Sequence, residues 1–198
     1  MIAADALSPA PARALARLER VLVALSQAAI GLIMLVVVAD VAMRYLVHRP
    51  LSWSYDLIGS YLMVAAFFLA LPDTLAAREH IAIDMLAPRL HRRILHPGLA
   101  LGYALSAVLV AIIAVQGWDR CVQAFRAGDL VSATVPWPTW PTHLIVALGA
   151  AVMALRCLVF AAGHTASLVT GRDHVDPPRP PDAPAPPAPP VPTGGDAP

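Results

Sequence analysis

Charged residues are scarce in this sequence, and lysine is absent from it. Only 14% of its 198 residues carry a charge, while 58% are hydrophobic; soluble domains contain about 25% charged residues. A soluble core of this size has to be covered by polar side chains, and these are missing here. The composition therefore predicts an integral membrane protein and excludes a water-soluble enzyme.

Other absences exclude further classes. All 14 basic residues are arginine and the net charge is only +1, so no basic patch indicates nucleic acid as a partner. The two cysteines, Cys121 and Cys157, lie far apart and form no CxxC pair, which argues against a disulfide framework or a redox pair. No HExxH motif or Ser/His/Asp set is present. We therefore expect no catalytic site, no cofactor and no metal.

Three uncharged stretches are long enough to cross a membrane, and a further one, Leu57–Pro72, reaches spanning length if Asp73 sits at the interface and the helix continues to Ala77. The first, Val21–Ala39, covers about 30 Å as a helix. It is too long for a signal-peptide core of about 7–15 residues, so we expect it in the mature protein. The prolines before Trp140 predict that the fourth helix begins there, and we expect Arg156 near its end to snorkel. The predicted fold class is thus all-α with four transmembrane helices, at about residues 21–43, 56–77, 94–118 and 140–162.

The ends of the chain differ from this core. Residues 1–17 form a cytoplasmic lead-in, which is either an amphipathic helix on the membrane surface or a simple extension of the first span. The transmembrane domain covers residues 18–168. Residues 169–198 are rich in proline and alanine and are expected to be a disordered, solvated tail; an alternative is a ligand for an SH3-type domain.

Arginine in the flanks of the spans predicts their direction. Eight arginines fall on the side of the N-terminus and four on the other side. Because short cytoplasmic flanks carry the excess of positive charge, both termini are expected to be cytoplasmic.

Three clusters stand at the ends of the predicted spans. The stretch between spans one and two reads RYLVHRPLSWSYD, the stretch Arg78-Glu79-His80-Ile81 with Asp84 follows span two, and VPWPTWP precedes span four. Ordinary interfacial anchors, helix caps and an aromatic belt account for such residues; a subunit interface is the functional alternative. The candidate interface residues are Arg44, Tyr45, Pro50, Trp53, Asp56, Arg78, His80, Asp84, Pro136 and Trp140.

In their order and spacing these clusters resemble the small, DctQ-like permease subunit of tripartite ATP-independent periplasmic (TRAP) transporters. The resemblance covers roughly residues 20–160. It rests on Arg44-Tyr45, on Pro50 with Trp53 and Asp56, on His80-Ile81 with Asp84, and on Pro136 with Trp140. The sequence departs from the family pattern in having Asp56 in place of glutamate, and in lacking a proline before Gly149.

The resemblance implies a noncatalytic scaffold in the bacterial inner membrane. Its partners would be a large permease subunit, which holds the substrate and ion sites, and a periplasmic binding protein that delivers an organic acid such as a C4-dicarboxylate. Uptake would be driven by an ion gradient. The alternative is a haem- or quinone-associated membrane anchor of a respiratory enzyme, which needs histidines facing each other within the spans. The seven histidines fall in loops or near span ends, where hydrated or snorkelling rings are expected.

Overall fold

The computed structural model describes residues 9–76, 92–132 and 135–170, and these residues are almost entirely helical. Four helical segments are long and apolar enough to cross a membrane: Ala14–Leu46, Ser54–Leu75, Pro97–Ala127 and Trp140–Ser167. The described ranges contain no β-strand, only an isolated bridge between Leu130 and Pro138. For the described residues, the predicted all-helical fold with four helices long and apolar enough to span a membrane is therefore confirmed.

The first span is one continuous helix, α1 (Pro9–Leu46). Residues 9–17, the described part of the lead-in, belong to this helix. Its inward positions recur at alternating steps of four and three residues, which is the period of a helix that packs along a single seam. The seam consists of Leu15, Glu19, Leu22, Ser26, Ala29, Ile33, Val36 and Asp40, all buried except the half-buried Ile33.

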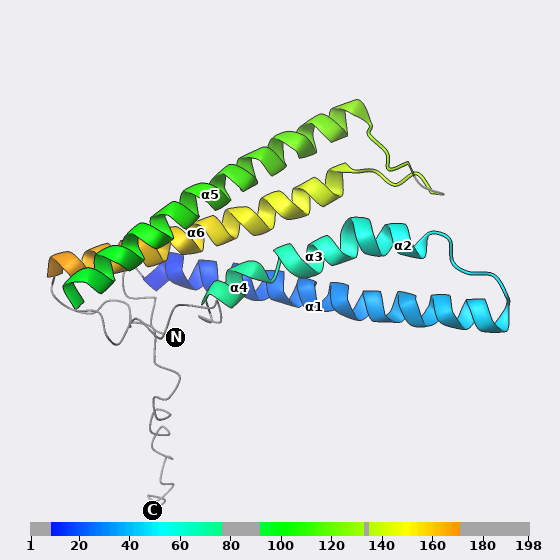
Figure 1. The fold of residues 1–198 in the computed structure, drawn as a ribbon, viewed down its shortest axis with the longest axis horizontal. Coiled ribbons are helices and arrows are strands. Elements are labelled where there is room, and N and C mark those ends of the chain that lie inside the picture. Colours follow the sequence, from blue (N-terminus) through cyan, green and yellow to red (C-terminus); the bar gives the residue numbers. More distant parts are fainter. Residues whose placement is uncertain (1–8, 77–91, 133–134, 171–198) are drawn as a thin grey trace, which may run out of the picture.

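The second span is broken into short helices. It comprises α2 (Ser54–Leu57), the π-helical turn η1 (Ile58–Leu62), α3 (Met63–Phe68) and α4 (Leu71–Ala76). Pro72 explains the break before α4, because proline has no N–H to donate to the carbonyl four residues earlier, that of Phe68, and its ring would collide with it. Figure 1 shows the resulting bend between α3 and α4.

The third and fourth spans, α5 (Arg92–Ala127) and α6 (Trp140–Thr170), form an antiparallel pair. The start of α6 at Trp140 confirms the prediction made from the prolines. Small residues on α5 allow the two backbones to approach closely. At Gly117, an added Cβ would lie 3.3 Å from Ala147 on α6. The buried small residues of this α5 seam are Ala100, Ala107, Gly117, Cys121 and Ala124.

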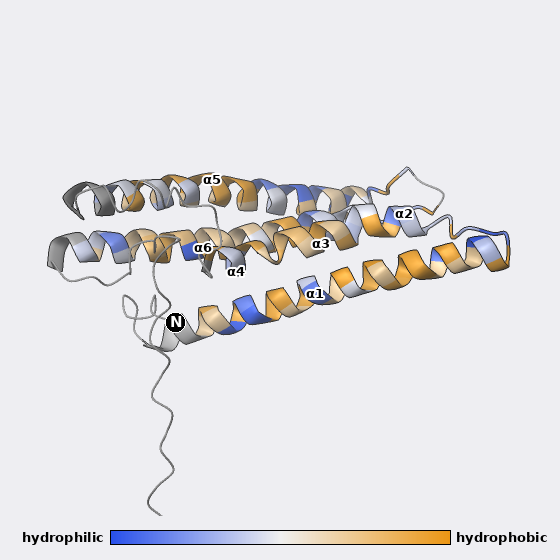
Figure 2. Ribbon diagram, turned by 60° about the horizontal axis from the view of Figure 1, so that its bottom comes forward, coloured by the Kyte–Doolittle hydropathy of each residue, from blue (hydrophilic) through white to orange (hydrophobic). Residues whose placement is uncertain are grey.

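Helix α6 is the centre of the bundle. It packs against α5 on one side and against α3 and α4 on the other, and α1 packs against α3 and α4 in turn, an order that can be followed in Figure 2. Half of the most apolar window of α6 is buried, against 11% for α5 and 22% for α1. The outer helices α1 and α5 therefore expose most of their surface to lipid or to partners.

Candidate functional site

The corner between α1 and α2 (residues 40–54, here called the corner) is organised by Asp40. Its side chain, only 6% exposed, ends the buried seam of α1. Oδ1 accepts a hydrogen bond from the Leu51 backbone N–H at 2.7 Å, and Oδ2 accepts one from Arg44 Nη2 at 3.0 Å. One carboxylate thus fixes both the last turn of α1 and the returning chain.

The backbone of the corner closes α1 tightly. The N–H groups of Val47 and Arg49 both donate to the Met43 carbonyl, at 3.0 and 3.4 Å. Between them His48 has φ of 56°, the left-handed conformation in which helices commonly end. On the far side of Pro50, the Ser54 hydroxyl donates to the Leu51 carbonyl at 2.8 Å. The corner is therefore held by hydrogen bonds from both sides of the proline.

The structure places the predicted residues of this region in different surroundings. Arg44 pairs with Asp40, a residue that the sequence analysis did not include. Trp53 lies half-buried at the start of α2, and Asp56 stands in the first turn of that helix, where its charge suits the helix N-terminus. Tyr45, 76% exposed, and Pro50 face outward. The latter two are available to a partner or to headgroups.

The approach to the fourth span is tied to the second span. The Tyr61 hydroxyl donates to the Pro138 carbonyl, and the Thr142 hydroxyl donates to the Ser60 carbonyl at 2.7 Å. The ring of Trp137 packs edge-on against Tyr61, with centroids 5.9 Å apart. These contacts join η1 to the start of α6, at the same end of the bundle as the corner (Figure 1, right).

The two predicted residues in the segment that leads into α6 lie in different surroundings. Trp140 opens α6 and packs edge-on against Phe125 of α5, with ring centroids 5.8 Å apart. Pro136 is exposed in the connection. The third group of candidates, Arg78, His80 and Asp84, lies outside the described residues.

A buried ion pair links α1 to α6. Arg156 donates through Nε to Glu19 Oε1 at 2.7 Å and through Nη2 to Glu19 Oε2, with side chains 13% and 3% exposed. The guanidinium carbon also lies 5.8 Å from the centre of the Phe160 ring. The prediction that Arg156 snorkels was wrong, because its partner is inside the bundle. The sequence analysis missed Glu19 by starting the span at Val21, although the seam period from Leu15 to Asp40 places Glu19 inside.

His164 also departs from the expectation. Instead of being hydrated or snorkelling, it is 2% exposed on α6, and its ring stacks on Tyr103 of α5 with centroids 5.6 Å apart. Within the described ranges no group of three or more His, Cys, Asp or Glu side chains is arranged to hold a metal ion. The polar contacts described above lie within α1, between helices, or between a helix and a connection, and they hold these elements together.

Substituting Asp40 tests the corner. Asp40→Ala removes both of its hydrogen bonds and leaves the Leu51 N–H without its acceptor, so we expect a loss of about 1–3 kcal/mol in the free energy of unfolding. Asp40→Asn retains an oxygen acceptor and should lose less. Thermal unfolding in detergent measures both. Asp119→Ala, at an exposed position of α5, is the matched control, and an equal loss there would contradict the assignment.

Comparison with known proteins agrees with the resemblance seen in the sequence. A family model described as "Tripartite ATP-independent periplasmic transporters, DctQ component" matches residues 33–166, more than half of the chain. No curated protein and no solved structure matches the chain. The matched segment contains the corner, the second and third spans and nearly all of α6. The matched family is a family of transporter components and not of enzymes, and the match gives no support to the haem- or quinone-anchor alternative. The chain therefore belongs to the DctQ family and is a small, multi-pass membrane component of a TRAP transporter.

Proposed function

We propose that this chain is a noncatalytic scaffold for the large permease subunit of its transporter. The complex takes up an organic acid, such as a C4-dicarboxylate, that a periplasmic binding protein delivers, and an ion gradient drives uptake. The chain lies in the bacterial inner membrane with both ends in the cytoplasm, as the arginine distribution predicts.

The observation that carries the proposal is how the chain uses its buried charges. Glu19 is paired with Arg156, and Asp40 is bonded to Arg44 and to the backbone of Leu51. Ionisable groups that move substrate or protons across a membrane line a cavity or a relay of such groups. Here the Glu19 carboxylate holds α1 against α6, and the Asp40 carboxylate holds the corner against the end of α1. This use fits a support for a neighbouring transport domain.

The test is the requirement for this chain in a complete system. The large permease and the binding protein are produced with and without it, and two quantities are measured: the amount of large permease in the membrane and the uptake of the organic acid. We expect both to fall when the chain is omitted. Undiminished uptake without the chain would overturn the proposal.

A further inference from the structure

We propose that helix α5 carries a binding site for a phospholipid with a primary ammonium headgroup, of the phosphatidylethanolamine class. The site, here called the α5 lipid site, consists of a shallow hollow on the exposed side of the helix and of two charged side chains at its end, Asp119 and Arg120. The inference does not depend on the scaffold role, because it concerns the membrane around the chain and not a protein partner.

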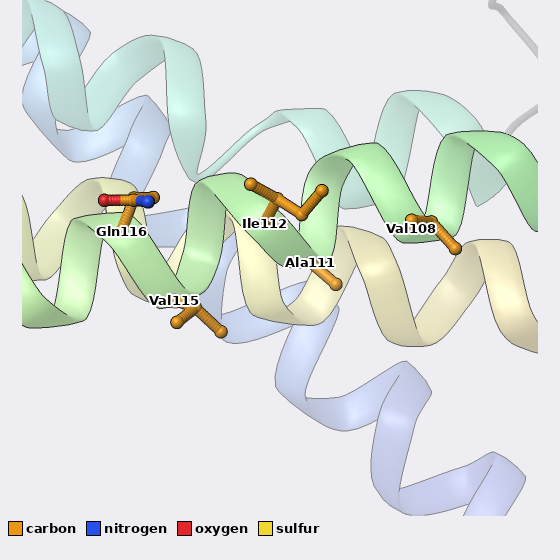
Figure 3. A pocket seen from close by; sticks show the side chains of 5 residues that line it. All are labelled: Val108, Ala111, Ile112, Val115 and Gln116. Carbon is orange, nitrogen blue, oxygen red and sulfur yellow. The ribbon is translucent and has the colours of Figure 1, made fainter.

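The hollow lies on the side of α5 that faces away from the bundle. Its lining residues all belong to this helix and are all exposed, as can be followed in Figure 3: Val108, Ala111, Ile112, Val115 and Gln116. On the packed side of the same helix, Gly117 approaches Ala147 of α6. Four of the five lining residues are apolar, so the hollow offers a hydrocarbon chain a surface to lie against.

The hollow ends at the edge of the membrane. The uncharged stretch of α5 runs as far as Trp118, which is 54% exposed, and tryptophan is enriched in the headgroup layer. Residues 108–116 rise about 12 Å along the helix, close to half of the roughly 30 Å hydrocarbon core. The hollow therefore spans one leaflet, at the end of the bundle where the corner lies.

Two opposite charges stand where the hollow ends. Residues four positions apart lie on the same side of a helix, so the edge of the hollow at Val115 leads to Asp119 and the edge at Gln116 leads to Arg120. Both charged side chains are exposed. Adjacent positions on a helix do not face each other, and no ion pair among the described residues includes either side chain. Both charges are therefore available to a ligand.

A headgroup with a phosphate and a primary ammonium matches this arrangement. The Arg120 guanidinium can donate charge-assisted hydrogen bonds to the phosphate, and the Gln116 amide, one turn deeper, offers further N–H donors. The Asp119 carboxylate can accept hydrogen bonds from the ammonium. A phosphatidylglycerol headgroup has no cation for Asp119, and the ammonium of phosphatidylcholine has no N–H to donate. The two charges thus select the phosphatidylethanolamine class.

Native mass spectrometry of the purified full chain tests the proposal. Phosphatidylethanolamine, phosphatidylglycerol and phosphatidylcholine with identical acyl chains are added separately in detergent, and the affinity for each is measured. The variants are Asp119→Asn, Arg120→Gln and Ala111→Phe, which fills the hollow. Arg49→Gln and Asp129→Asn, which remove exposed charges outside the α5 lipid site, are the matched controls. Unfolding temperatures in lipid-free detergent check that each variant is folded.

We expect the wild-type chain to bind phosphatidylethanolamine at least fivefold more tightly than either other lipid. Arg120→Gln should weaken this binding about fivefold, the upper value for one exposed charge pair. Asp119→Asn should weaken it by a similar factor and strengthen the binding of phosphatidylglycerol, because a repulsive charge is removed. Loss of folding would not produce this change of preference.

Ala111→Phe should weaken lipid binding without changing the order of preference, and the two controls should stay within twofold of the wild type. Equal affinity of the wild-type chain for the three lipids would overturn the inference. Tighter binding of phosphatidylglycerol than of phosphatidylethanolamine, or controls as weak as the site variants, would overturn it as well.

Discussion

Glu19→Leu is expected to destabilise the bundle by about 3–5 kcal/mol, because Arg156 would remain buried without its counter-charge. Arg156 is 13% exposed and has its guanidinium beside the Phe160 ring, so its charge is largely buried within the bundle. Arg156→Met leaves Glu19 buried without its counter-charge and should destabilise the bundle by a similar amount.

The double variant Glu19→Leu/Arg156→Met distinguishes a charge effect from a packing effect. It removes both charges, and apolar residues of similar volume replace buried ion pairs at little cost or with a gain in stability. We therefore expect its unfolding temperature to return close to that of the wild type. Arg20→Met, at the exposed neighbouring position, is the control and should change little. A double variant as unstable as either single variant would show that the pair is not the cause.

Gly149→Ala is the second substitution with a large expected effect. An added Cβ at Gly149 would lie 2.8 Å from the carbonyl carbon of Phe68, and closer still to its oxygen. The obstacle is backbone, at the break that Pro72 imposes before α4, so it cannot rotate away as a side chain can. Overpacking of this kind costs about 1–3 kcal/mol, and Gly149→Leu should cost more by separating α6 from α3.

Gly102→Ala is the matched control for this substitution. Gly102 lies in α5, is exposed, and has no atom within 4 Å of an added Cβ. Alanine is more favourable than glycine in a helix by about 1 kcal/mol, so this variant should be as stable as the wild type or more so. The two Gly→Ala changes are thus predicted to shift the unfolding temperature in opposite directions. A neutral Gly149→Ala would contradict the close approach of α6 to α3.

The spans were predictable because their signals are local. Uncharged runs predicted four helices, and the prolines before Trp140 predicted the start of α6. The seam of α1 could also have been predicted from the sequence, because Leu15, Glu19 and Leu22 already follow its period of alternating four and three residues. Reading that period would have placed Glu19 inside the bundle.

Contacts between distant segments were not predictable in the same way. Glu19 and Arg156 are 137 positions apart, and no local pattern says which helix faces which. The approach of Gly149 to Phe68 depends on the break at Pro72 and on the packing of α6, so the sequence analysis noted Gly149 only as part of a family pattern. At the corner, resemblance led to Arg44 and Asp56, whereas the partner of Arg44 is Asp40. The family motif marks positions but not their partners.

The central claim is that this chain supports the transporter without taking part in transport chemistry. The most direct measurement is uptake per assembled complex in three variants: Arg44→Ala and Trp53→Ala in the corner, and Asp56→Lys in the first turn of α2. Arg44→Ala removes the partner of Asp40, Trp53→Ala removes a half-buried ring, and Asp56→Lys reverses the charge in the first turn of α2, so we expect less large permease to copurify with the tagged chain. Asp56→Glu keeps the charge near the α2 N-terminus and should be mild. Uptake divided by the amount of complex should equal the wild-type value in every variant, and the substrate affinity of the binding protein should not change. Full copurification with abolished uptake would contradict the claim and assign the corner a direct part in docking or gating.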